Sequence, residues 1–176
     1  MFYMARDNGL DERFRASYQQ LFPLVYRLAV RITGDSDRAE DLAHDAFIRL
    51  YQRGGALADA DQTRYWLIRV VKNLSYNNEK RKQRERRAVE RLGRAEQPLE
   101  PSTEDLFLRE EDQGLVRELL SELPLNLRMP LVLKEYEGLT YREIGKILNI
   151  SEGNVKVRVF RGREKLAQLL EKRSTN

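Results

Sequence analysis

Residues 140–166 read TYREIGKILNISEGNVKVRVFRGREKL, and this pattern predicts two short helices that meet at a tight turn. Thr140 and Glu143 have the spacing of a capping box, in which each side chain bonds a free backbone N–H at the start of a helix. Positions 149–150 form the expected turn, and Ser151 can cap the second helix. Apolar residues recur at helical spacing on both sides of the turn: Ile144, Ile147, Leu148, Val155, Val159 and Leu166. The pattern is that of a helix-turn-helix.

The second of these helices carries cations on one side: Lys156, Arg158, Arg161, Arg163 and Lys165. Such a charge density has to be solvated or placed against phosphates and base edges. A plain solvated helix is the alternative, but it does not explain why the capping box, the turn and the basic face occur together. Phe160 lies among these cations, where it would pack on a neighbour or touch a thymine methyl group. The segment therefore predicts DNA binding.

The composition of the whole chain agrees with a polyanionic partner. Its 176 residues are 34% charged and 41% hydrophobic, with a net charge of +4. The absence of cysteine excludes a disulfide framework and thiolate metal sites, and it favours a cytoplasmic protein. No run of about 18 apolar residues and no signal-like start is present, so we expect neither membrane insertion nor export.

The residue types present in the chain also argue against catalysis. His44 is the single histidine and has no cysteine nucleophile to work with, so a solvated role is expected for it. Gly54, Gly55 and Gly153 lack the spacing of a phosphate-binding loop. We expect no metal or cofactor, and a protein that is not an enzyme.

The N-terminal half predicts three helices that share one core, over about 14–32, from a cap at 35–37 to Gly54, and over about 63–78. A charge reversal follows. Residues 79–94 hold eight Lys or Arg against three Glu, and residues 95–112 hold seven acids against one Arg. Adjacent blocks of opposite sign, with two prolines in the acidic one, are typical of a linker between domains.

Two more short helices are predicted after the linker. The first ends at Pro124, and the second covers 127–136 with Pro130 near its first turn. No strand pattern is present. The expected fold class is all-α, with two small helical domains joined by a linker.

Two separated regions resemble the extracytoplasmic-function (ECF) sigma factors of the sigma-70 family of bacterial RNA polymerase. The family's promoter-reading domain is resembled by three stretches, Leu123-Pro124, 136–144 and 153–163. Within the last stretch, Asn154 and Val157 differ from the residues that the family usually has there. Residues 37–50 resemble the helix that docks on the polymerase clamp, and 66–73 resemble the promoter-melting helix.

The resemblance implies a division into three parts. Residues 8–94 would be sigma region 2, a helical bundle that binds core polymerase and recognises and melts the minus-ten element. Residues 95–111 would be the acidic linker, either a spacer or a mimic of nucleic acid in the polymerase channels. Residues 112–172 would be sigma region 4, which reads the minus-thirty-five element. The implied partners are core RNA polymerase, through its clamp helices and flap, promoter DNA, and an anti-sigma factor.

Three sets of candidate residues follow. Acids at helical spacing share a face that could meet a basic partner or remain solvated, and the resemblance assigns it to polymerase. This polymerase-binding set is Asp37, Glu40, Asp41 and Asp45, together with Arg49 beside them. Aromatic residues among cations suit single-stranded DNA, although Trp66 could equally be core. This minus-ten and melting set is Tyr65, Trp66, Arg69, Lys72, Asn73 and Tyr76. The minus-thirty-five set is Asn154, Lys156, Val157, Arg158, Phe160, Arg161 and Arg163.

Two other functions fit part of the sequence. A stand-alone helix-turn-helix regulator would bind operator DNA and use its N-terminal helices to dimerise. An RNA-binding protein would use the basic run at 79–94 together with Tyr76. A helical enzyme domain is more remote than either.

Overall fold

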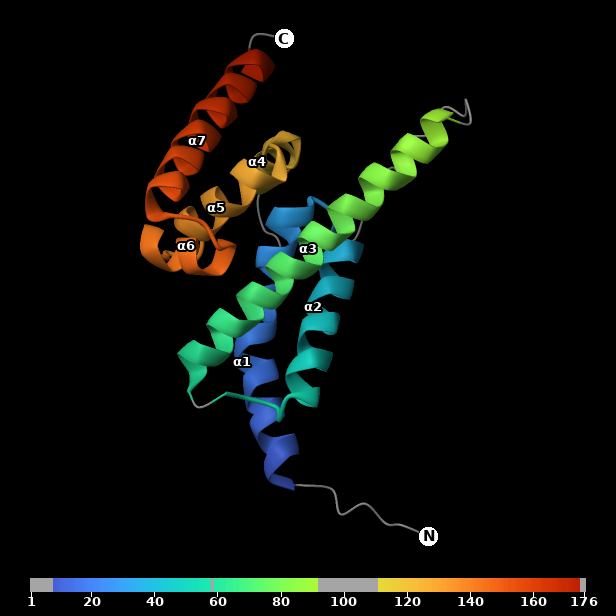
Figure 1. The fold of residues 1–176 in the computed structure, drawn as a ribbon, viewed down its shortest axis with the longest axis vertical. Coiled ribbons are helices and arrows are strands. Elements are labelled where there is room, and N and C mark those ends of the chain that lie inside the picture. Colours follow the sequence, from blue (N-terminus) through green and yellow to red (C-terminus); the bar gives the residue numbers. More distant parts are fainter. Residues whose placement is uncertain (1–7, 58, 92–110, 175–176) are drawn as a thin grey trace.

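The computed structural model describes residues 8–57, 59–91 and 111–174, and helices account for nearly all of these ranges (Figure 1). The helices are α1 (Asn8–Thr33), α2 (Ser36–Gln52), α3 (Ala60–Arg91), α4 (Glu111–Glu122), α5 (Leu125–Glu135), α6 (Tyr141–Leu148) and α7 (Glu152–Ser174). No strand occurs within these ranges, so the all-α prediction is confirmed. The predicted acidic linker at 95–111 lies outside the described residues, apart from Glu111 at the start of α4.

Helices α1, α2 and α3 form the N-terminal unit, a bundle around a shared apolar core. Val25 and Leu28 of α1, Phe47 and Leu50 of α2 and Leu67 of α3 are fully buried in it. The predicted pattern, in which apolar residues recur every three or four positions, therefore identified the buried faces of these helices correctly.

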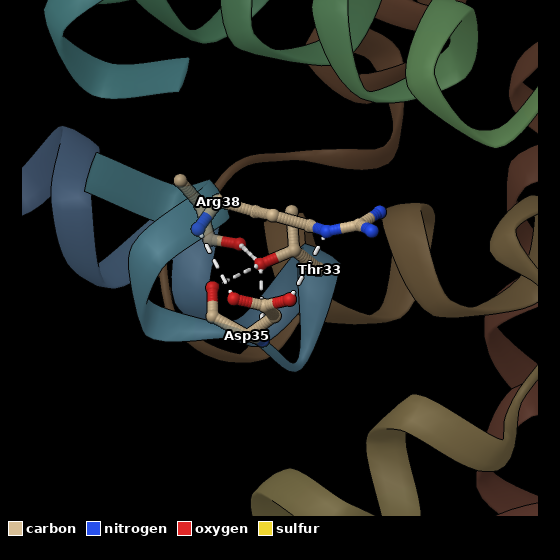
Figure 2. Close-up of polar contacts among 4 residues, drawn as sticks. Thr33, Asp35 and Arg38 are labelled. Carbon is tan, nitrogen blue, oxygen red and sulfur yellow. Dashed lines mark hydrogen bonds and ion pairs between the residues drawn. The ribbon is translucent and has the colours of Figure 1, made fainter. Parts of the chain in front are cut away.

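The corner between α1 and α2 is closed by short-range polar contacts, which Figure 2 shows. The Asp35 carboxylate accepts from the Arg38 backbone N–H (3.1 Å) and pairs with the Arg38 guanidinium (3.1 Å). The Asp35 N–H donates to the hydroxyl of Thr33 (3.2 Å). Gly34 has φ +73°, and a Cβ there would lie 2.8 Å from Cβ of Ser121 in α4. Only glycine therefore meets both the backbone and the packing requirement of this corner.

Helix α3 is longer than the sequence pattern predicted. The charge pattern alone grouped the basic run at 79–94 with the interdomain linker, whereas the family resemblance placed it in region 2, and its residues up to Arg91 continue α3 beyond the bundle (Figure 1). Arg, Lys, Gln and Glu have high helix propensity, and Arg81 pairs with Glu85 one turn later (3.5 Å). Charge alternation in this run therefore marks a solvated helix, and the linker prediction was wrong for this part.

Helices α4 to α7 form the C-terminal unit, in which the predicted helix-turn-helix is α6 and α7. Thr140 and Glu143 form the capping box, and Asn149 ends α6 in the left-handed conformation (φ 57°). The Ser151 hydroxyl accepts from the Asn154 N–H (3.2 Å) and caps α7 as expected. Pro130 is the sixth residue of α5 and is buried, so it lies beyond the first turn where it was predicted.

The two units pack against one another and share one cluster of buried residues. Helix α1 contacts α4 and α5, and α3 contacts α6, as Figure 1 shows. The sequence pattern did not predict this placement, because amphipathic spacing identifies a buried face without naming the element that covers it.

None of the helices in the described ranges combines the length and the apolar character that crossing a membrane requires.

Candidate nucleic-acid interface

The outward side of α7 carries the predicted minus-thirty-five residues in two rows. A helix turns about 100° per residue, so residues three, four or seven apart lie above one another. One row is Asn154, Val157 and Arg161, with Arg158 beside it, and the other is Lys156, Phe160 and Arg163. Val155 and Val159 are buried on the opposite side of the helix.

The first row is accessible to a partner, with Arg158 beside it partly buried. Val157 is 48% exposed, and Arg161 and Asn154 are also exposed. The Asn154 side-chain oxygen accepts from Nε of Arg158 (2.8 Å), which holds that guanidinium along the helix. This row offers an apolar group flanked by hydrogen-bond donors, the mixture that reads base edges in a major groove.

Two cations of the second row have partners within the C-terminal unit. Nζ of Lys156 lies 2.9 Å from the Glu152 carboxylate. Nε of Arg163 donates to the Glu135 carboxylate of α5 (3.0 Å), and this bond raises the pKa of Arg163. Phe160 lies between these pairs and is 61% exposed. Its ring is therefore open to a partner and does not fill the core.

The predicted melting residues on α3 divide between two faces. One face of α3 carries four of them at steps of four, three and four residues: Tyr65, Arg69, Lys72 and Tyr76. Both ends of this face, at Tyr65 and at Tyr76, lie toward the C-terminal unit. The Tyr65 hydroxyl donates to the Glu143 carboxylate of α6. Tyr76 is half-buried, and burial raises its pKa while the charge of Arg158 in α7 lowers it.

Trp66 and Asn73 lie on the neighbouring face of α3. Asn73 is exposed, and its amide oxygen accepts from Nζ of Lys72 (2.8 Å). Burial, and secondly the nearby Arg69 charge, lowers the pKa of Lys72. Trp66 is half-buried, with the Arg53 guanidinium 5.7 Å from its ring centre. It thus packs against the core while remaining partly exposed.

The acidic residues predicted to bind polymerase are all exposed on α2: Asp37, Glu40, Asp41 and Asp45, with Arg49 beside them. Asp41 and Asp45 also border a groove of about 320 Å³ against α3. Ile48 (54% exposed) and Tyr51 (42% exposed) lie near this acidic face. Sequence reasoning missed both, although an apolar residue outside the α2 core spacing was the available signal.

His44 also lies on the exposed side of α2. Nε2 of His44 lies 3.5 Å from the Glu40 carboxylate, and the imidazole stands 5.2 Å from the Phe22 ring. The expectation of a solvated His44 agrees with this position. Among the described residues, no group of three His, Asp or Glu side chains is placed to hold a metal ion.

Family comparisons match both units. The model described as sigma-70 region 2 matches residues 17–86, and the model described as sigma-70, region 4 matches residues 113–166. RNA polymerase sigma-H factor of Pseudomonas aeruginosa is 30% identical, covering 97% of both chains. ECF RNA polymerase sigma factor SigW of Bacillus subtilis is 32% identical, covering 83% of this chain and 82% of SigW.

A solved structure has a similar fold. The sigma factor RpoE from Bartonella quintana, crystallised with the anti-sigma factor NepR, superposes with a TM-score of 0.71 at 21% identity. The alignment covers 90% of this chain and 96% of that one.

The two helical units and both family matches define a sigma factor of bacterial RNA polymerase. Within that class, the chain belongs to the ECF sigma factors of the sigma-70 family. The protein therefore acts in transcription initiation, by directing RNA polymerase to promoters.

Proposed function

We propose that the two units divide the work of initiation. Residues 8–94 act as region 2, which binds core polymerase and recognises and melts the minus-ten element. Residues 112–172 act as region 4, which reads the minus-thirty-five element. Each range matches its own family model and has its own buried apolar residues and helix caps, which supports treating it as a functional unit.

The outward row of α7 is the observation that carries the minus-thirty-five assignment. On the second helix of the helix-turn-helix, hydrogen-bond donors are supplied by Asn154, Arg158 and Arg161, and methyl groups by Val157. In that motif the second helix enters the major groove with its N-terminal residues at the bases. Phe160 and Lys156 would flank this row, and Arg163 would act through its bond to Glu135.

On α3, Trp66 and Asn73 are the residues best placed to hold an unstacked base, because both border solvent on the face away from α6. Arg69 and Lys72 would hold the backbone of the single strand. Tyr65 and Tyr76 would join them once their contacts with the C-terminal unit are released.

The acidic face of α2 would meet the clamp helices of the polymerase. Carboxylates at Asp37, Asp41 and Asp45 supply charge complementary to a basic partner, and Ile48 and Tyr51 supply apolar area next to them. Mixed patches of this kind are typical of specific interfaces. The C-terminal unit would contact the polymerase flap.

An anti-sigma factor is a further expected partner, since a structural neighbour was solved in complex with one. The protein would act as a binding and positioning factor in the cytoplasm, where the polymerase works, without catalysing a reaction of its own.

Run-off transcription tests the proposal. Purified core polymerase should initiate at defined start sites only when this chain is added, on promoters selected from a random library. Gel shift of the same fragments by the chain alone, without polymerase, would instead support a stand-alone regulator. Preferential binding of RNA at matched salt would support the RNA-binding alternative.

A further inference from the structure

One hydrogen bond on the outward side of α7 joins two side chains of the proposed reading surface. The Asn154 side-chain oxygen accepts from Nε of Arg158, and the two atoms lie 2.8 Å apart. Residues four apart on a helix lie one above the other, so this bond runs along the helix surface. Both partners belong to α7, and the bond therefore does not depend on where the N-terminal unit lies.

The atom of the guanidinium that Asn154 binds decides which donors remain for a partner. An arginine side chain carries five N–H groups, and the bond to Asn154 takes the single one on Nε. The two Nη groups form the outer end of the planar guanidinium and carry the other four. They are the pair that can meet the O6 and N7 atoms of a guanine in the major groove. With Nε held, Arg158 is set to approach a base end-on.

Asn154 is itself held in the first turn of α7. Its backbone N–H donates to the Ser151 hydroxyl that caps the helix (3.2 Å). Asn154 is exposed, and Arg158 is half-buried one turn later. In a helix-turn-helix the N-terminal residues of the second helix contact the base edges. The bond therefore lies at the end of α7 where bases are read.

An arginine that is already ordered binds a base more tightly than a free one. Ordering a long side chain at an interface weakens binding by roughly two- to tenfold. The bond to Asn154 orders Arg158 before DNA is bound, so much of this loss is avoided. Because the bond also favours the end-on orientation, it makes the contact more selective as well as stronger.

We propose that Asn154 is a positioning residue that holds Arg158 for bidentate recognition of one guanine in the minus-thirty-five element. The inference rests on the proposed assignment of α7 to that element, and it adds the base that Arg158 reads. Asn154 differs from the residue that the family usually has at this position, so the family resemblance does not supply this bond. Asn154 thus controls the preference for a guanine that it does not itself contact.

Base preference of the holoenzyme tests this role. A promoter is first selected from a random library and then randomised in its minus-thirty-five element, and the fragments bound by core polymerase carrying the full chain are sequenced. The unchanged chain should prefer guanine at one position, and Arg158→Ala should reduce that preference about tenfold, the discrimination of a good bidentate contact. Asn154→Ala should reduce it at the same position by about two- to tenfold.

Two further variants separate positioning from other effects of a change in α7. Asn154→Asp keeps an oxygen that accepts from Nε, so it should retain the guanine preference while its added negative charge lowers the overall affinity for DNA. Glu152→Ala is the matched control, because it removes an ion pair between residues four apart at the same end of the helix, Glu152 with Lys156 (2.9 Å). It should leave the guanine preference unchanged.

The outcomes distinguish this inference from the proposed function. A guanine preference that survives Asn154→Ala in full would overturn the positioning role, as would equal losses in Asn154→Ala and Asn154→Asp. A preference that Asn154→Ala alters at a different position from Arg158→Ala would show that Asn154 reads a base of its own, and would also contradict the inference. If neither Arg158→Ala nor Arg161→Ala changed promoter binding, the assignment of α7 to the minus-thirty-five element would fail, and the inference with it.

Discussion

Glu143 shows how one side chain serves both local structure and long-range contact. Its carboxylate accepts hydrogen bonds from Tyr65 and from Thr140, and these bonds lower its pKa from 4.5 to about 2, with Tyr65 the largest cause. The capping role was readable from the Thr-x-x-Glu spacing. The bond to Tyr65 was not, because 78 residues separate the two partners.

Tyr65→Phe should raise the pKa of Glu143 toward its ordinary value, because the variant loses the main donor to the ionised form. A depressed carboxyl pKa stabilises the fold above about pH 4.5, and this stabilisation is lost as the pH falls toward 2. In the variant the loss should begin at higher pH. Carboxyl-carbon NMR titration of glutamate-labelled protein measures this; an unchanged Glu143 pKa would contradict the bond.

Gly145 is a second residue whose role depends on tertiary detail. A Cβ at this position would lie 2.8 Å from the Ile150 carbonyl oxygen, a backbone atom that cannot easily move. Glycine therefore permits α6 to run close to the turn that starts α7.

Gly145→Ala should destabilise the protein by about 1 to 3 kcal/mol, the usual cost of forcing an extra group into a packed site. Gly153→Ala is the matched control, since nothing lies within 4 Å of a Cβ there. Urea unfolding followed by circular dichroism compares them. Equal midpoints for the two variants would show that the turn can relax.

At the scale of elements, α7 combines a packing role and a reading role on different sides. Its buried side contains Val155, Val159 and Gly162. Its cations looked equivalent in the sequence. The structure separates Arg163, which bonds Glu135, from Arg161 on the outward row.

Arg161→Ala should therefore weaken promoter binding by the holoenzyme by about 1 to 3 kcal/mol if it reads a base, or lower the salt slope by about one if it contacts a phosphate. Arg163→Ala should leave both quantities nearly unchanged, because its charge is already paired within the unit. Mobility shifts over a range of salt concentrations distinguish the cases. A larger effect from Arg163→Ala would mean that the rows are wrongly assigned.

Helix α3 shows the limit of charge patterns as evidence. Charge reversal predicted a boundary near residue 94, which lies outside the described residues, and the basic run before it belongs to a helix as far as Arg91. Local propensity decided this, since Arg, Lys, Glu and Gln favour a helix wherever no proline interrupts them.

At the scale of the whole molecule, Arg128 links the units most directly. Its guanidinium donates to the carbonyls of Ile32 in α1 and of Ser121 and Leu123 around the end of α4, and burial lowers its pKa. One side chain thus satisfies helix ends from both units.

Arg128→Ala should lower the free energy of unfolding by about 2 kcal/mol, because the bonds of a charged donor are lost and the carbonyls it served lose a partner. Arg173→Ala, which loses only exposed pairs, should have little effect. Hydrogen exchange would locate the change, with faster exchange expected at the end of α1. Protection that is unchanged there would contradict the linking role.

The sequence by itself determined the helices, their buried faces, the capping box and turn of the helix-turn-helix, and the sigma-factor resemblance. These depend on contacts between residues a few positions apart, where periodicity and caps act directly. Only the tertiary structure decided how the two units meet, which cations already have partners and which tyrosines are engaged across the interface. Those outcomes depend on residues such as Arg64 and Glu137, 73 positions apart, whose pairing no local pattern records.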